Sequence, residues 1–272
     1  MNAPPSPSVD LDAARTAVRR AADDFARLVA SAPDAGIPIP GSEWTVGDAA
    51  AHVALGTEAY VGYSRGGTEP WVDVSDIAGG SLARSNAGRL DVEPVREPAV
   101  LAARVQAAAA ELLATTEGRS GDEAVTWNGL TVTLSAMLGL GLGEYRLHGR
   151  DVAKALDRPW PITPDDARLV LASALPMLPL LVDPSTTADV RASFDLRPTA
   201  HPQVGVVIRD GRLTVGADDG PVDCHVSADP VALLLVSYGR RSQWVPMLTG
   251  KLLAWGRKAW LGVRLTSYLV TP

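Results

Sequence analysis

The sequence has little of what would tie it to an oxidising compartment or to a membrane. A single cysteine, Cys224, occurs in 272 residues, so no internal disulfide can form and a reducing compartment is expected. The longest apolar run, residues 169–182, is too short to span a bilayer and is interrupted by Pro176 and Pro179. Residues 1–8 lack the apolar segment of a signal peptide. These absences predict a soluble cytoplasmic protein.

The sequence also lacks any concentrated block of one charge. Its 25 basic and 31 acidic side chains are mixed along the chain and give a net charge of −6. No basic run or polybasic cluster indicates nucleic acid or a membrane surface as a partner. A hydrophobic content of 46% with 21% charged residues is typical of a globular protein, which the sequence allows to be a monomer or a homodimer.

The first two thirds of the chain carry apolar residues at helical spacing. Thr45 with Asp48 three residues later forms a capping-box pattern that predicts the start of the second helix, directly after Trp44. The segment 64–97 is rich in Gly, Pro, Ser and Asp and is predicted to be a long loop, of a kind that often serves as a lid or binds ligands. Helices are expected over 11–28, 49–63, from Pro98, over 133–156 and from Thr163 to about 179.

The last third of the chain changes to the alternation of β-strands. Asp210-Gly211 between two apolar runs predicts a hairpin of strands 204–208 and 213–215. Further strands are expected at 192–196 and 222–226, and Asp229-Pro230 opens a helix through Tyr238. We therefore expect an up-down four-helix bundle over residues 1–183 and a smaller α+β domain over 184–272, divided at Asp183-Pro184-Ser185.

Three residues on two of these helices indicate a metal site. Glu144 and His148 are four residues apart, so they share one face of the fourth helix, and that stripe is otherwise apolar. His52 lies on the inward stripe of the second helix. Two imidazoles and a carboxylate suit zinc or another divalent metal and leave a fourth position open, as in catalytic sites. Asp151, three residues after His148, is a candidate catalytic residue that orients a ligand or binds substrate.

Each candidate also has a simpler interpretation. A Glu–His pair at this spacing is common on helices without a metal, and an inward histidine such as His52 is often a hydrogen-bonded core residue. Arg240 and Arg241 can bind an anionic substrate or be a solvated pair. Cys224 is expected to be a small buried residue. Core packing is expected for Trp244, Trp255 and Trp260 rather than the lining of a pocket, and His201 and His225 receive no role.

Two segments resemble the mycothiol-dependent maleylpyruvate isomerase family. They are residues 43–52 (EWTVGDAAAH) and residues 144–156 (EYRLHGRDVAKAL). The resemblance implies a DinB-like metal-binding bundle in which His52, Glu144 and His148 bind zinc. Residues 238–241 (YGRR) and 250–256 (GKLLAWG) are similar to a sterol-carrier-like domain that follows this bundle. The resemblance also implies mycothiol as a low-molecular-weight thiol cosubstrate.

The chemistry expected of such a site begins with a thiol held on the metal as thiolate. A zinc-bound thiolate can attack a small electrophile, which can be anionic, with Arg240 contacting the substrate. Addition, bond rotation and loss of the thiol give cis–trans isomerisation of the maleylpyruvate type, whereas retention of the thiol gives S-transfer. The alternatives are a non-catalytic module that binds an apolar ligand and a zinc hydrolase that uses bound water.

Overall fold

The computed structural model describes residues 9–199, 203–216 and 220–271, so His201 and the segment 1–8 lie outside the described residues. The chain forms two compact units. The helical unit consists of residues 9–73 and 82–162, and the sheet unit contains residues 74–81 and everything described from Thr163 onward. The predicted fold class, a helical bundle with a smaller α+β domain, is confirmed.

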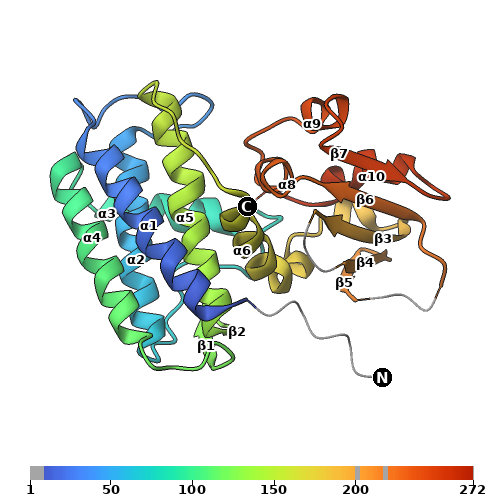
Figure 1. Ribbon diagram of the computed structural model, residues 1–272, viewed down its shortest axis with the longest axis horizontal. Helices are drawn as coiled ribbons and strands as arrows, with labels where there is room; N and C mark the ends of the chain where they lie inside the picture. Colours follow the sequence, from blue (N-terminus) through green and yellow to red (C-terminus); the bar gives the residue numbers. More distant parts are fainter. Residues whose placement is uncertain (1–8, 200–202, 217–219, 272) are drawn as a thin grey trace. The chain divides into compact units, whose positions relative to one another are not determined.

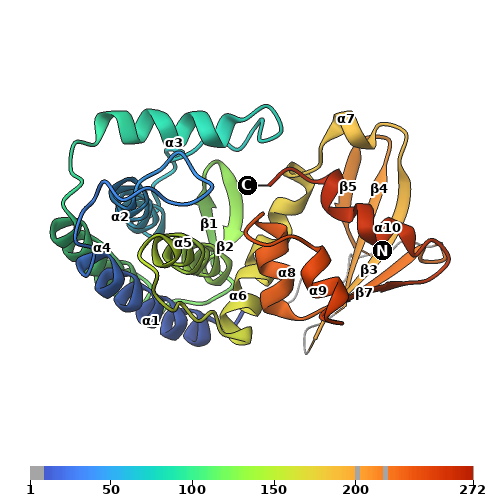
Figure 2. The same cartoon turned by 90° about the horizontal axis from the view of Figure 1, so that it is seen from above.

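Four long helices make the bundle of the helical unit (Figure 1): α1 (Leu11–Ala30), α2 (Val46–Ser64), α4 (Pro98–Thr115) and α5 (Leu134–Ala155). Helices α1 and α2 each pack against both α4 and α5. The end-on view in Figure 2 shows the four helices gathered around one core, with α3 (Ser81–Val92) running across them. Among their largest fully buried side chains are Phe25, Leu101, Leu112, Met137 and Tyr145.

Two elements of the helical unit differ from the sequence prediction. The segment 64–97, predicted as a loop, contains helix α3, whose polar sequence gives only a weak apolar face. A β-hairpin of β1 (Ala124–Trp127) and β2 (Leu130–Thr133) precedes α5 and was not predicted. Its turn is Asn128-Gly129, and Thr133 at its end caps α5 by accepting a hydrogen bond from the Ala136 amide.

A five-stranded sheet forms the centre of the sheet unit, in the order β5-β4-β3-β6-β7. The strands are β3 (Arg191–Pro198), β4 (Val204–Arg209), β5 (Arg212–Val215), β6 (Cys224–Ala228) and β7 (Leu252–Trp255). Strands β3 and β6 are parallel, and the other neighbours are antiparallel. The hairpin at Asp210-Gly211 and the strands predicted at 192–196 and 222–226 are confirmed, whereas β7 was not predicted.

Helices of the sheet unit supply the rest of its core. They are α6 (Pro164–Ala174), the 3₁₀ helix η1 (Leu175–Leu180), α7 (Pro184–Thr187), α8 (Pro230–Ser237), α9 (Trp244–Leu248), α10 (Trp260–Arg264) and the 3₁₀ helix η2 (Leu265–Tyr268). The predicted helix after Asp229-Pro230 corresponds to α8. The core itself contains Phe194, Val206, Ile208, Leu213, Val226 and Leu261.

The sheet unit begins earlier than the domain division predicted after Asp183. Helix α6 packs on α8, and η1 packs on β5, so this stretch of the chain belongs to the sheet unit by its contacts. Leu175 and Val182 of the apolar stretch 169–182 belong to the core of the sheet unit, and Leu178 packs against that core. No helix within the described ranges is long and apolar enough to cross a membrane.

Candidate metal centre

Helix α2 begins with the capping box that the sequence predicted, and this fixes the position of His52. The Asp48 amide donates to Thr45 Oγ1 at 3.2 Å, and the Thr45 amide donates back to Asp48 Oδ2 at 3.0 Å. Arg96 Nε also donates to Asp48 Oδ1 at 2.7 Å and ties the start of the helix to the segment before α4. His52 follows one turn later with a side chain only 5% exposed.

Helix α5 brings Glu144 and His148 to the same point. Glu144 Oε2 lies 3.2 Å from His52 Nε2 and 3.4 Å from His148 Nε2. One ligand atom from each of the three side chains lies within 4.8 Å of the other two. Within the part of the chain that the structure describes, no other group of three His, Cys, Asp or Glu side chains is arranged in this way. The structure therefore brings together the three residues that the sequence singled out.

The carboxylate of Glu144 is held in its charged form by the two histidines. Burial raises the pKa of Glu144, but hydrogen bonds from His148 and His52 and their charge together lower this pKa well below its ordinary value. The Glu144 side chain is still 27% exposed, compared with 15% for His148. The three side chains thus form a cluster of donor atoms, of which Glu144 is the most exposed member.

Two tryptophans pack against the imidazoles. The Trp44 ring centroid lies 4.9 Å from that of His52 and 5.7 Å from that of His148. The Trp71 ring lies 4.9 Å from His52 and against Gly56, where a Cβ atom would come within 3.3 Å of the indole. These apolar neighbours restrict the histidine rotamers and lower the local dielectric around the cluster.

Comparison with known proteins identifies the family of the helical unit. The family model described as mycothiol maleylpyruvate isomerase N-terminal domain matches residues 15–153, just over half of the chain. The chain belongs to this family. The match contains most of α1, all of α2 and α4 and nearly all of α5, and it includes the three candidate ligands of this chain.

Solved structures extend the likeness to the rest of the chain. The crystal structure of the mycothiol-dependent maleylpyruvate isomerase covers 90% of this chain and 92% of its own, with 16% identity and a TM-score of 0.53. The structure of a histidine-to-alanine mutant of that enzyme has the same coverage, with 15% identity and a TM-score of 0.55. At these identities the likeness shows the fold alone. No curated protein sequence matches this chain.

The two predicted catalytic residues have different surroundings. Asp151 lies on α5 with the candidate ligand His148, and its Oδ2 is 3.8 Å from His148 Nδ1. Arg240 lies in the sheet unit, where its Nη1 donates to the Tyr238 carbonyl oxygen at 2.8 Å. The catalytic roles of both residues stay predictions.

Other sequence interpretations can be compared with the structure directly. Cys224 is buried in the sheet, and burial, aided by the charge of Asp223, raises the pKa of its thiol despite a hydrogen bond from the Gly262 amide. The expectation of core packing for three tryptophans is wrong, because Trp244, Trp255 and Trp260 are 55%, 41% and 61% exposed. His225 stacks on the Trp255 ring and contacts the Asp195 carboxylate at 2.8 Å.

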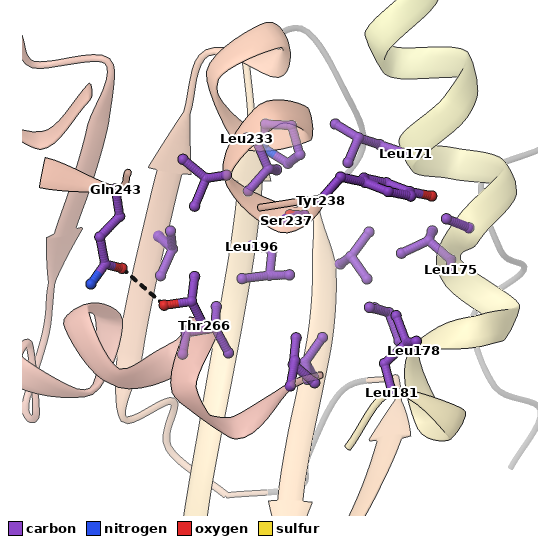
Figure 3. Close-up of a pocket in the computed structure, with 18 of the residues that line it drawn as sticks. Leu171, Leu175, Leu178, Leu181, Leu196, Leu233, Ser237, Tyr238, Gln243 and Thr266 are labelled. Carbon is purple, nitrogen blue, oxygen red and sulfur yellow. Dashed lines mark hydrogen bonds between the residues drawn. The ribbon is translucent and has the colours of Figure 1, made fainter. Parts of the chain in front are cut away.

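The sheet unit contains an apolar cavity of about 140 Å³ (Figure 3). Leucines of α6 and η1, namely Leu171, Leu175 and Leu178, face Leu196 of the sheet and Leu233 of α8 across it. The polar side chains at its edge include Gln243 and Thr266, which are hydrogen-bonded to each other at 3.1 Å. None of the three exposed tryptophans lines it.

Proposed function

We propose that this protein is a thiol-dependent metalloenzyme of the mycothiol maleylpyruvate isomerase type. His52, Glu144 and His148 would hold one divalent metal, for which zinc is the best candidate, and mycothiol would be the thiol cosubstrate. The observation that carries the proposal is the convergence of these three donor atoms within 4.8 Å of one another. Membership of the family and the whole-chain likeness to an enzyme described as mycothiol-dependent support it.

The donor set fits zinc in chemistry, and two of its three separations also fit the zinc geometry. Ligands bound tetrahedrally at about 2.0–2.1 Å from zinc lie roughly 3.3 Å from one another. The separations of Glu144 Oε2 from the two imidazole nitrogens, 3.2 and 3.4 Å, match that edge length. Two imidazoles with one carboxylate are also a set found in catalytic zinc sites, where the fourth position is left for water or substrate.

A divalent metal bound there lowers the pKa of a coordinating thiol, so that the thiol is present as thiolate at neutral pH. The chain's own residues fix the geometry for this chemistry. Trp44 and Trp71 would hold His52 in place. The thiol and the electrophile would enter past Glu144, the most exposed of the three side chains. Asp151, near His148 Nδ1, would stabilise the ring orientation in which Nε2 is the ligand.

The reaction that fits is addition of the thiol sulfur to an activated double bond. Rotation about the resulting single bond, followed by loss of the thiol and restoration of the double bond, gives cis–trans isomerisation. If the sulfur stays on carbon and a proton is taken up at the neighbouring carbon, the outcome is S-transfer. The thiol must come from outside the protein, because Cys224 is buried in the sheet unit and its thiol pKa is raised.

The metal assignment is tested by elemental analysis and zinc titration of the native chain and three variants. We expect about one metal per native chain, and loss of that metal in His52→Ala and His148→Ala. His225→Ala is the matched control, since it removes an imidazole from the sheet unit and should leave the metal content unchanged. Full occupancy in either ligand variant would overturn the assignment.

The thiol is tested by calorimetric titration of mycothiol into zinc-loaded protein. Binding is expected with the native chain and His225→Ala, and none with the metal-free ligand variants. Activity is then compared with and without mycothiol on a cis-configured α,β-unsaturated diacid. Absence of any binding heat with zinc-loaded native protein would rule out the thiol-dependent mechanism while leaving the metal site intact.

The apolar cavity favours a second candidate function, binding of a small apolar ligand by the sheet unit. The cavity is lined mainly by apolar side chains, the kind of lining that binds small apolar ligands. Engineered cavities of about 150 Å³ bind benzene-sized molecules. We expect Leu178→Trp, which fills the cavity, to abolish binding of benzene measured by NMR, and Leu180→Trp outside the lining to retain it.

A further inference from the structure

Asn128 has a conformation that its hairpin turn requires, but a side chain that the turn does not need. Asn128 and Gly129 have φ values of 47° and 78°, the left-handed pair of a type I′ turn between the paired residues Trp127 and Leu130. Glycine or aspartate would suit the first position equally well. In most such turns the side chain is in solvent, whereas Asn128 is only 4% exposed.

The Asn128 carboxamide oxygen accepts from three donors that lie far from it in the sequence. Oδ1 accepts hydrogen bonds from Tyr63 Oη at 2.6 Å, from the Trp71 amide at 2.8 Å and from the Val72 amide at 3.0 Å. A carbonyl oxygen has two lone pairs, so this acceptor is fully used. The bonds join the hairpin, the end of α2 and the segment that follows α2, over 56 to 65 residues of chain.

These bonds determine where the Trp71 ring lies. The Trp71 amide is shared between Asn128 Oδ1 at 2.8 Å and Tyr63 Oη at 2.7 Å, and the Trp71 carbonyl oxygen accepts from Arg89 Nε of α3 at 2.5 Å. With both sides of its backbone fixed, Trp71 places its ring against Gly56 and 4.9 Å from the His52 ring. No polar atom of the Trp71 side chain is needed for this contact, so the ring's position depends on its backbone.

We infer that Asn128 is a positioning residue for the metal centre, acting through Trp71 on the imidazole of His52. The inference rests on the proposed function, because it takes His52 to be a ligand. Asn128 touches none of the three ligand side chains in the contacts described above. It holds the Trp71 backbone, and the Trp71 ring in turn limits the rotation of His52. Removing a residue that orients a metal ligand without binding the metal itself typically lowers metal affinity 10–100-fold.

The experiment compares two substitutions that both keep the turn. Asn128→Gly retains the left-handed conformation and removes the acceptor, and zinc affinity, measured by competition with a chromophoric chelator, should fall about tenfold. Asn128→Asp retains an acceptor oxygen and tolerates the same backbone, and it should bind zinc within roughly threefold of the native chain. The visible spectrum of Co²⁺ bound at the site should change in Asn128→Gly and be native-like in Asn128→Asp.

Two further variants separate positioning from loss of stability. Ser64→Ala removes a buried hydroxyl that is bonded to the Val61 carbonyl oxygen and Thr115 Oγ1, so it should lower Tm and leave zinc affinity unchanged. In a Trp71→Leu background, Asn128→Gly should cause no further loss of zinc affinity, because its effect passes through that ring. Should Asn128→Gly fail to fold, Tyr63→Phe removes one donor to Asn128 and the second acceptor of the Trp71 amide, and it should also lower zinc affinity, but less, because Asn128 still accepts from the Trp71 and Val72 amides.

The outcomes distinguish this inference from the metal proposal. Native-like zinc affinity and an unchanged Co²⁺ spectrum in Asn128→Gly, with the native chain binding zinc, would overturn the inference and leave the metal site standing. An equal tenfold loss in Ser64→Ala would also overturn it, since the effect would then follow stability alone. A native chain that binds no zinc would overturn the metal proposal itself, and the inference with it.

Discussion

Gly149, the residue after the candidate ligand His148, allows Trp160 to approach helix α5 closely. A Cβ atom at this position would lie 2.1 Å from Trp160 Cζ2, so the Trp160 ring would have to shift to make room for it. Trp160 is fixed there by a hydrogen bond from its Nε1 to the Arg146 carbonyl oxygen at 2.9 Å. The close packing of Trp160 on α5 next to His148 therefore requires glycine at position 149.

Gly149→Ala is expected to destabilise the protein although alanine favours helices. Displacing Trp160 should cost about 1–3 kcal/mol, which outweighs the gain of up to about 1 kcal/mol in helix propensity. Gly88→Ala in α3 is the matched control, since nothing lies within 4 Å of a Cβ atom there, and it should leave stability equal or higher. Urea unfolding measures both, and equal stabilities of the two variants would contradict the steric argument.

Some residues of the candidate site could be predicted from the sequence, and others could not. His52, Glu144 and His148 were predictable, because helical spacing places each on an inward stripe and few other histidines exist. Asn128 and Trp71 were not, since their roles depend on contacts across 57 residues of chain. The dipeptide Asn128-Gly129 is a local signal for the hairpin turn, but it does not indicate which groups the Asn128 side chain contacts.

At the scale of elements, the residue at which α2 begins determines the position of His52 along the axis of the bundle. Asp48 accepts hydrogen bonds from Thr45 and Arg96. Burial raises the pKa of Asp48, but these hydrogen bonds and the charge of Arg96 lower it below its ordinary value overall. A carboxylate whose pKa is lower in the folded state stabilises the fold above its unfolded pKa of about 4, and this contribution is lost as the pH falls.

Asp48→Asn should therefore lower the free energy of unfolding by about 1 kcal/mol at pH 7, and the difference from the native chain should shrink toward pH 3. Urea unfolding at the two pH values measures this difference. Glu111→Gln is the control: Glu111 pairs with Arg65 on the surface, both side chains are about half exposed, and little change is expected. A deficit in Asp48→Asn that persists undiminished at pH 3 would exclude the charged capping box as its cause.

Elements with strong local signals were predicted, and elements fixed by distant contacts were not. The capping box of α2, the hairpin at Asp210-Gly211 and the Pro-initiated helices α6 and α8 each have a cap or turn that acts within a few residues. Helix α3 has a polar sequence with only a weak apolar face, and edge strand β7 is only four residues long. Both take their form from packing that the sequence does not reveal.

At the scale of the whole molecule, the two candidate binding sites belong to different units. All three metal-ligand candidates lie within residues 9–73 and 82–162, whereas every residue that lines the apolar cavity lies beyond Thr163. Each unit also has its own buried core. A ligand stabilises only the structure that must open for it to leave, so occupancy of one site should act on one unit.

Hydrogen exchange with and without zinc tests this separation. At a free zinc concentration 100-fold above its Kd, the amides of α2 and α5 that exchange through opening of the bundle should gain about 2.7 kcal/mol of protection. Amides of β3 and β6 should exchange at unchanged rates, and His148→Ala should abolish the effect in α2 and α5 alike. Equal added protection in the bundle and in the sheet would mean that the two units open as one, because the metal can transmit its binding free energy only to structure that unfolds together with its ligands.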